Sequence, residues 1–321
     1  MAALAMAVFA SCSNEDELSQ SNYPADNVVR IMASMDGMDT RASYGSSTAK
    51  LSLFGFCINN ANSTTYTYDN IKVIQENCNW KPATQMLWQN STTAVDILAY
   101  APYQESTEDA SGKVKIFGKT DYAFSVQTNQ NTADDYSSDL IVYKQTGFTP
   151  GLELNTSKAV DVTFTHLLSQ LNLTIELRDQ FNQDENNPVA AGFVTDVKVN
   201  GTIINSKVNF AASPISVQVD GTQAADITPE TTEFKAAGKT TDHAAFNYSA
   251  IVIPQTVTTG NFSISFKVNG TDYIWTSTSD VKFVSGKKHQ LSLLVGKDVV
   301  QVNGITATPW GKENIIQGET D

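Results

Sequence analysis

The 321-residue chain is poor in the side chains that most enzymes use for catalysis or metal binding. It holds only three histidines (His166, His243 and His289) and three cysteines, with no HExxH, CxxC, GxSxG, phosphate-binding or dinucleotide-binding motif. His166 and His289 lie at the ends of expected strands, which favours structural hydrogen bonding over catalysis. A glycosidase would need only two carboxylates brought together by the fold, which a sequence does not show. We expect no enzyme activity, no cofactor and no metal site.

Basic residues are also scarce. The chain has 21 Lys and Arg against 34 Asp and Glu, which gives a formal net charge of -13. This balance argues against a nucleic-acid partner and against electrostatic attachment to anionic lipid. No apolar run approaches the length of a transmembrane helix. Contact with a membrane is therefore expected only through a covalent lipid.

A lipid-attachment signal stands at the start of the chain. Phe9-Ala10-Ser11-Cys12 reads as a bacterial lipobox, in which the thiol of Cys12 is acylated and residues 1–11 are removed as a signal peptide. The segment before Cys12 has no Lys or Arg, which favours a translation start further upstream. Cys57 and Cys78 then remain, either as a disulfide or as two buried thiols.

The next segment, residues 12–41, contains a strand that is followed by an arginine. From Val28 to Asp36 the side chains alternate, which predicts a strand with one apolar face. That face carries Val29, Ile31, Ala33 and Met35. Asp36-Gly37 ends the run, and Arg41-Ala42 follows in an open, protease-accessible context. A lipid anchor, a strand and an exposed arginine in this order suggest a removable strand; an ordinary sheet strand beside a chance Arg-Ala pair is the alternative.

From Leu51 onward the sequence predicts short strands and turns with almost no helix. The strands are rich in β-branched residues and give an all-β sandwich in each half of the chain. The Pro150-Gly151 loop marks the expected boundary between domains at residues 42–152 and 153–321. Asn200-Gly201 and Asn269-Gly270 each predict a two-residue hairpin turn.

Aromatic residues crowd the first half of the chain. Stacked on an exposed face they could bind sugar rings, whereas turned inward they form core, and core is the favoured interpretation. The residues concerned are Tyr66, Tyr68, Trp80, Trp88, Tyr100 and Tyr103. A surface lipoprotein that binds glycans and keeps its N-terminal strand is therefore the alternative function.

Several short stretches, in order, resemble the fimbrillin family, the lipoprotein-derived subunits of type V fimbriae. They are Ala99-Tyr100-Ala101-Pro102-Tyr103, Ser138-Asp139-Leu140-Ile141, Phe164-Thr165-His166 with the strand Leu171 to Leu177, and Gly286-Lys287-Lys288 with Ile305 and Trp310. The likeness spans nearly the whole chain after Cys12. It implies two tandem transthyretin-like β-sandwich domains and a structural, adhesive role in a cell-surface fimbria.

The resemblance also implies a mode of assembly. Members are anchored in the outer membrane by lipid, here on Cys12, until an Arg-specific protease cuts after an arginine, here Arg41, to leave Ala42 first. Losing the strand with Val29, Ile31, Ala33 and Met35 opens a groove that a strand from a neighbouring subunit fills. The tail after Trp310 looks brief for an appended donor strand. The chain could therefore be a tip or accessory subunit, or carry its donor strand before Trp310.

Overall fold

The computed structural model describes residues 22–35, 51–77, 79–105, 115–132, 135–182, 188–239, 242–297 and 300–310. Cys12, Arg41, Ala42 and Cys78 lie outside the described residues. Within them, regular structure is almost entirely β, and the helices are α1 (Pro150–Glu153) and two 3-10 turns (Asp179–Phe181 and Ala191–Phe193). The all-β fold expected from the sequence is confirmed.

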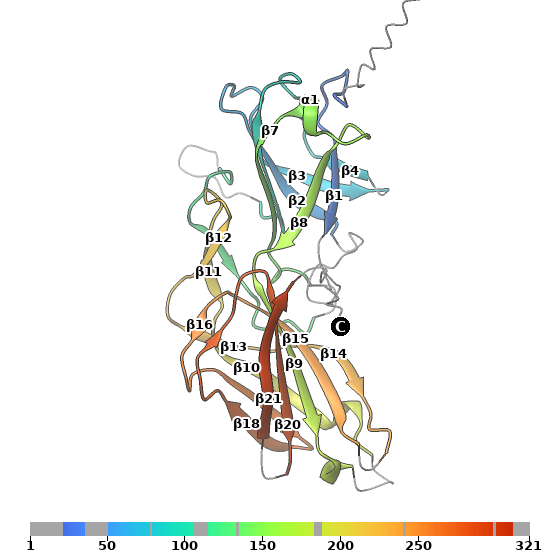
Figure 1. Cartoon of the computed structure of the whole chain (residues 1–321), viewed down its shortest axis with the longest axis vertical. Coiled ribbons are helices and arrows are strands. Elements are labelled where there is room, and N and C mark those ends of the chain that lie inside the picture. Colours follow the sequence, from blue (N-terminus) through green and yellow to red (C-terminus); the bar gives the residue numbers. More distant parts are fainter. Residues whose placement is uncertain are drawn as a thin grey trace, which may run out of the picture.

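Two lobes are stacked along the long axis of the molecule (Figure 1). The upper lobe is built on one seven-stranded sheet of order β1-β8-β7-β5-β2-β3-β4. Its strands are β1 (Ile31–Met35), β2 (Leu53–Asn59), β3 (Tyr68–Glu76), β4 (Asn79–Pro82), β5 (Val95–Ala101), β7 (Ile141–Phe148) and β8 (Val160–His166). The sheet curls around its own apolar core, so that its two edge strands, β1 and β4, line opposite sides of one cleft.

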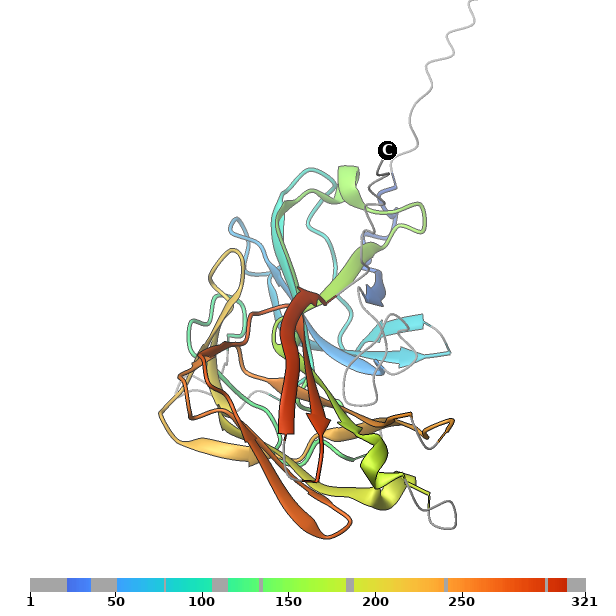
Figure 2. The same cartoon turned by 60° about the horizontal axis from the view of Figure 1, so that its bottom comes forward.

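The lower lobe packs a five-stranded sheet, β14-β15-β9-β20-β21, and a four-stranded sheet, β13-β10-β17-β18, around a second core. The five-stranded sheet consists of β9 (Ser169–Leu177), β14 (Glu230–Lys235), β15 (Ala244–Val252), β20 (Lys287–Val295) and β21 (Val300–Pro309), and the four-stranded sheet of β10 (Val194–Ile203), β13 (Ala224–Ile227), β17 (Ser263–Val268) and β18 (Thr271–Thr276). The lower lobe also contains a two-stranded sheet, formed by β16 (Thr256–Val257) and β19 (Val281–Lys282). Figure 2 shows β20 and β21 side by side on the outside of this lobe.

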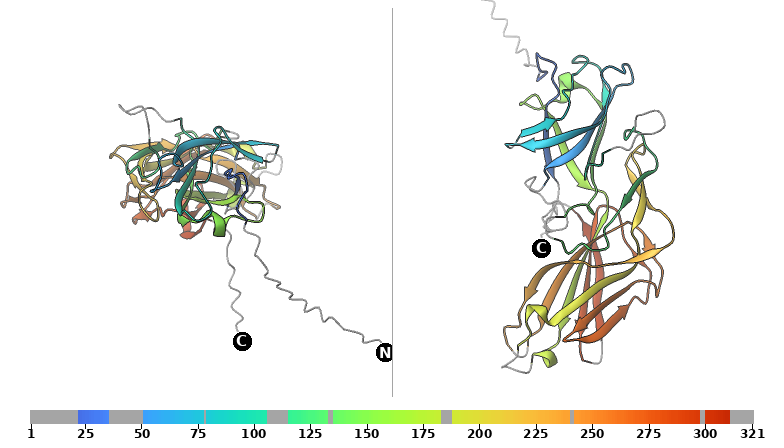
Figure 3. Two further views of the ribbon diagram at one scale, coloured as in Figure 1. Left: turned by 90° about the horizontal axis from the view of Figure 1, so that it is seen from above. Right: turned by 180° about the vertical axis from the view of Figure 1, so that it is seen from behind.

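A three-stranded sheet connects the lobes. It has the order β12-β11-β6, with β6 (Tyr122–Ser125), β11 (Asn205–Asn209) and β12 (Ser216–Val219), and lies alongside the junction (Figure 3). The ammonium group of Lys144 on β7 donates to the carbonyl oxygens of Phe210, Ala211 and Ala212 at 2.7, 3.0 and 2.9 Å. This lysine therefore ties the upper sheet to the turn after β11.

Replacing Lys144 by Met is expected to lower the free energy of unfolding by about 2 kcal/mol. The apolar stem is kept, but three carbonyl oxygens at the junction lose a charged donor. Chemical denaturation monitored by circular dichroism would measure the loss. Lys207→Met is the matched control, because Lys207 makes only an exposed ion pair with Asp220 at 2.9 Å. A Lys144→Met variant as stable as the control would contradict the role.

The strand pairing bears on the expected domain limits. β8 lies beyond residue 152, yet it hydrogen-bonds to β7 and to β1 within the upper sheet. Leu167 and Leu168 then lead directly into β9 of the lower lobe. The limits at residues 42–152 and 153–321 stay a prediction, and the position of β8 favours a junction near Leu167.

The two Asn-Gly turn signals have different outcomes. Asn269-Gly270 connects β17 and β18 with φ angles of 47° and 80°, which confirms the hairpin. The prediction of a hairpin at Asn200-Gly201 is wrong. β10 continues through both residues, and its register with β13 shifts there. Gly201 has a φ of 91°, and a Cβ atom on it would lie 1.9 Å from the carbonyl oxygen of Asn261. The glycine serves a bulge and a close backbone approach.

Candidate functional site

β1 buries the row of side chains that the alternating pattern indicates. Val29, Ile31 and Met35 are 2%, 5% and 7% exposed, and Ala33 is partly buried against the same core. On the opposite face Met32 is 49% exposed and Ser34 is exposed. The strand therefore contributes core residues to the upper lobe, and its removal would uncover that core.

Only one edge of β1 is hydrogen-bonded to a strand in the described part of the chain. β1 runs parallel to β8, with Ile31 opposite Val160 and Met35 opposite Phe164. The amide of Val160 donates to the carbonyl oxygen of Arg30 at 2.8 Å. In a parallel ladder the bonding residues alternate, so Met32 and Ser34 bond to β8 while Ile31, Ala33 and Met35 direct their backbone groups away from it.

The other edge of β1 faces the cleft toward β4. This cleft has a volume of about 990 Å³, and its walls include Ile31 and Ala33 on one side and Trp80 and Pro82 on the other. Figure 1 shows β1 (dark blue) at the side of the upper lobe, with β8 and β4 as its neighbours. β1 is therefore an edge strand that lies next to an open surface.

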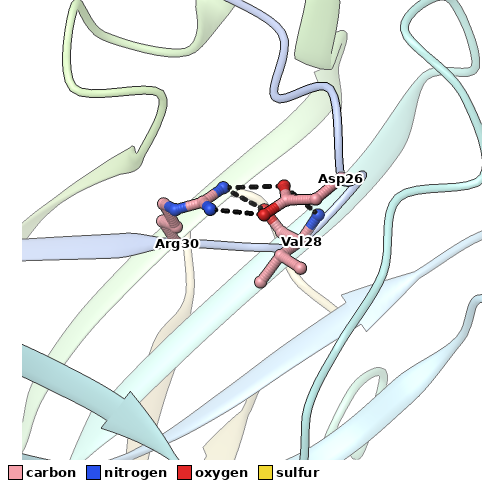
Figure 4. A network of polar contacts seen from close by, with 3 residues as sticks. All are labelled: Asp26, Val28 and Arg30. Carbon is pink, nitrogen blue, oxygen red and sulfur yellow. Dashed lines mark hydrogen bonds and ion pairs between the residues drawn. The ribbon is translucent and has the colours of Figure 1, made fainter.

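Before β1, a small set of hydrogen bonds fixes the chain. The amide of Val29 donates to the carbonyl oxygen of Met86 at 3.0 Å, and that of Trp88 donates to Asn27 at 2.8 Å. The guanidinium of Arg30 donates two bonds to the Asp26 carboxylate, which also accepts the Val28 amide at 3.1 Å (Figure 4). These bonds lower the pKa of Asp26 from 3.8 to about 2. The stabilisation is thus present above pH 3.8 and is lost as the pH falls through about 2.

A second edge strand is β21, at the border of the lower lobe. It pairs only with β20 among the described strands, and Val302 and Ile305 are 38% and 40% exposed. Its end is fixed by Trp310, whose ring stacks on His166 with centroids 3.9 Å apart and planes 3° apart. The Trp310 amide also donates to the carbonyl oxygen of Gly286 at 2.9 Å.

His166 lies where the two lobes meet. It is the last residue of β8, and its Nδ1 lies 3.0 Å from the Asp139 carboxylate, with both side chains fully buried. His289 on β20 accepts the amide of Val284 through Nε2 at 3.0 Å. Both histidines thus have structural hydrogen bonds. No group of three or more His, Cys, Asp or Glu side chains in the described part of the chain is arranged to hold a metal ion.

The aromatic residues considered for sugar binding form core rather than a platform. Tyr100 and Trp88 are 0% and 2% exposed, and Tyr68 and Trp80 pack against the core of the upper lobe. Tyr66 and Tyr103 are only partly exposed. Nothing in this set supports the glycan-binding alternative.

Cys57 is a free, fully buried thiol on β2, and burial raises its pKa well above the ordinary value. Its Sγ accepts the amide of Asn70 at 3.2 Å. Cys57 is therefore a buried free thiol, while Cys78 lies outside the described residues and its pairing stays a prediction.

The alternating pattern indicates the buried face of β1 but not the elements that surround it. The cleft wall on β4 and the stacking of Trp310 on His166 join residues far apart in the chain, and no local pattern indicates either. Val160, Val162 and Phe164 alternate with polar residues in the sequence, but only the pairing of β8 with β1 shows that they lie beside the buried row of β1 in the same sheet.

Two stacked β lobes with a peripheral N-terminal strand place the chain among two-domain all-β proteins. Comparison with known proteins then gives the family. The fimbrillin-like family model matches residues 40–310, so the chain belongs to the fimbrillin-like family. β1 lies before the matched span. Membership indicates a fimbrial type of protein that functions at the cell surface. Among curated proteins none matches this chain.

Solved structures share the fold at low sequence identity. A Bacteroides ovatus protein assigned to cell adhesion has a TM-score of 0.63 at 13% identity, over 89% of this chain and 99% of its own. A Bacteroides uniformis protein with the same assignment has a TM-score of 0.57 at 20% identity, over 89% and 99%. A fimbrial protein from Bacteroides vulgatus has a TM-score of 0.51 at 16% identity, over 88% and 99%. No helix in the described part of our chain is long and apolar enough to cross a membrane.

Proposed function

We propose that the chain is a structural and adhesive subunit of a cell-surface fimbria, assembled by strand exchange after proteolysis. It is exported as a lipoprotein with lipid on Cys12, held at the outer membrane, and cut after Arg41 by an Arg-specific protease so that Ala42 becomes the first residue. The segment with Val29, Ile31, Ala33 and Met35 then leaves, and a strand of a neighbouring subunit takes its place. The proposal covers a subunit of the stalk, a tip subunit and an accessory subunit.

The observation that carries this proposal is the one-sided attachment of β1. A strand bonded along one edge can be replaced by another strand without rebuilding the sheet, because β8 keeps all its own groups in place. Its buried row also makes an empty groove costly, since Phe164 and Val160 would then meet water. A new strand that restores both the bonds and the apolar row is thus strongly favoured.

Treatment of the purified, unlipidated chain with an Arg-specific protease is expected to give one stable product that begins at Ala42. The sequence has three arginines, Arg30, Arg41 and Arg178. The backbone of Arg30 is hydrogen-bonded to Val160, and that of Arg178 to Val295. Both are poor protease substrates, because a protease cuts backbone that is exposed and free of such bonds. Intact mass and N-terminal sequencing identify the product, and native gels report higher oligomers.

Arg41→Gln is the matched control and should stay uncut and monomeric under the same conditions. Resistance of the natural chain at Arg41 would contradict the proteolytic trigger. A cut product that retains the N-terminal fragment through size exclusion would contradict strand removal.

A further inference from the structure

β18 is an edge strand of the four-stranded sheet, because β17 alone is hydrogen-bonded to it among the described strands. Figure 1 shows it toward the left side of the lower lobe. Ile274 in its middle is 63% exposed, more than any other large apolar side chain on a described strand. Exposed apolar edge strands are places where another strand can add to a sheet. We propose that β18 pairs with β18 of a second copy of this chain, antiparallel and about a two-fold axis at Ile274.

The hairpin between β17 and β18 fixes which backbone groups point to the free edge. In a two-residue hairpin the residues that flank the turn, here Val268 and Thr271, bond to each other, and the bonded pairs then alternate. Every second residue of β18 after Thr271 therefore bonds to β17. The Ser277 amide continues this series with its bond to the carbonyl oxygen of Phe262 at 2.9 Å. The N–H and C=O groups directed to the free edge are thus those of Asp272, Ile274 and Thr276.

The inner face of β18 holds the strand in place. The ring of Tyr273 stacks on Phe266, with centroids 5.8 Å apart and planes 9° apart, and its hydroxyl donates to the carbonyl oxygen of Lys297 at 3.1 Å. The ring of Trp275 packs edge-on against Phe262 at 6.1 Å. Because the strand is already ordered, a pairing strand pays little for fixing it, which favours association.

The outward face of β18 is self-complementary in one register. With the axis at Ile274, this residue lies opposite Ile274 of the second copy, and Asp272 lies opposite Thr276. Cross-strand apolar pairs of this kind stabilise a sheet. All three edge residues of each strand then bond to the other copy. An axis at Tyr273 would instead place Asp272 opposite Ile274, a carboxylate against an apolar side chain.

Charge also favours this register. Asp272 is the only charged residue of β18, and Lys267 lies opposite it on β17 of the same copy. In the paired strands the carboxylate of Asp272 accepts the hydroxyl of Thr276 from the second copy. The two Asp272 carboxylates stay about 13 Å apart along the strand, beyond the screening length of about 8 Å at physiological salt. Each charge thus has a complementary neighbour, and no like charges lie opposite each other.

The other edge strands outside the candidate site are protected against such pairing. Short length and charged side chains are common protections of sheet edges. β4, β6, β12 and β13 have four residues each, and the strands of the two-stranded sheet have two. β14 has six residues but carries exposed Glu233 and Lys235. β18 has six residues and no Lys, Arg or Pro, so it is the edge that a second copy fits.

The pairing goes beyond the proposed function, because it joins subunits side by side. β18 lies in the lower lobe, whereas the groove that β1 leaves lies in the upper lobe, so one subunit can use both. Two fimbriae that lie next to each other would present one β18 from every subunit. Many weak pairs along two such fibres add up to firm lateral attachment.

Disulfide trapping tests the register in the uncut, unlipidated full chain with Cys12→Ser and Cys78→Ser, where Cys57 stays buried. One copy carries Asp272→Cys, and the other carries Thr276→Cys and a size tag. The proposed register puts these two positions about 5.5 Å apart between Cα atoms, within the span of a disulfide. Two copies of the same variant hold their cysteines about 13 Å apart along the strand. After mild oxidation the mixed dimer should exceed either dimer of identical copies at least tenfold.

Ile274→Lys tests the interface without a new cysteine. The side chain is 63% exposed, so the fold should persist, which circular dichroism checks. The substitution places two ammonium groups opposite each other at the two-fold axis, which opposes pairing. Sedimentation equilibrium should show self-association weakened at least tenfold. Val219→Lys is the matched control, because Val219 is 37% exposed on β12, an edge strand of another sheet, and its substitution should change nothing.

Three results would overturn the proposal. Equal linking of mixed and identical copies would exclude the two-fold register. Self-association that Ile274→Lys leaves unchanged, or that Val219→Lys weakens as much, would exclude β18 as the interface. A natural chain that stays monomeric up to roughly 1 mM would exclude self-pairing altogether. All of these experiments use the uncut chain, so their failure would leave the cleavage and strand exchange of the proposed function untouched.

Discussion

Replacing Ile31 by Asp is expected to detach β1 and to lower the free energy of unfolding of the uncut chain by about 4 kcal/mol. Ile31 is 5% exposed and lies in the core of the upper lobe beside β8. An unpaired carboxylate cannot stay in that position, and large losses of this kind come from burying unpaired charge. Among the described strands, β8 alone is hydrogen-bonded to β1, so β1 can leave while the rest of the sheet persists.

Two measurements separate detachment from general unfolding. Denaturant unfolding gives the total loss, and hydrogen exchange gives its location. The amides of Val160, Val162 and Phe164 are directed at β1, so their exchange should become fast while that of β5 and β7 stays slow. Uniform acceleration across the upper lobe would contradict an independently detachable strand.

Met32→Asp is the matched control for this variant. It places the same side chain one residue along the same strand, but on the outward face, where Met32 is 49% exposed. The expected loss is below about 0.5 kcal/mol, as for surface positions generally. Equal effects of the two substitutions would mean that the two faces of β1 do not differ as the burial indicates.

The strand content of the chain was largely predictable, and its long-range pairing was not. Alternation predicts β8 and β9 well, because a strand with one buried face repeats every two residues and both strands are of this kind. By contrast, the apolar pair Ile116-Phe117 favours a strand by its residues alone, but it lies in a turn region where both amides donate to the Asp69 carboxylate. Tertiary hydrogen bonding there overrides the local pattern.

The candidate site shows the same division. The apolar face of β1 follows from its own residues, but the parallel pairing with β8 joins segments some 130 positions apart, which no local rule specifies. The position of Trp310 against His166 likewise depends on how the lobes dock. The dipeptide Asn-Gly shows that one local signal can have two outcomes. Asn200-Gly201 forms a bulge where the backbone of Asn261 approaches closely, whereas Asn269-Gly270 forms a hairpin turn with nothing close to its glycine.

The largest effect at the junction is expected from Asp139→Ala, with a loss of about 3–5 kcal/mol in the free energy of unfolding. Asp139 and His166 are both fully buried and 3.0 Å apart. Removing the carboxylate leaves Nδ1 of His166 without this partner, in a ring whose Nε2 is already without one. Breaking one member of a buried pair costs this much because the other stays desolvated. Asp139→Asn keeps a hydrogen-bonding oxygen and should lose clearly less.

Asp220→Ala is the control, because its ion pair with Lys207 is exposed and such pairs contribute about 0–1 kcal/mol. Since His166 supports the ring of Trp310, Asp139→Ala should also loosen the end of β21, seen as faster exchange of the Trp310 amide, which donates to Gly286. A stability loss with unchanged exchange there would mean that Asp139 stabilises the lobes alone. Faster exchange would mean that the junction holds β21 in place, so that the pair at the end of β8 restrains one edge strand while β8 itself holds the other.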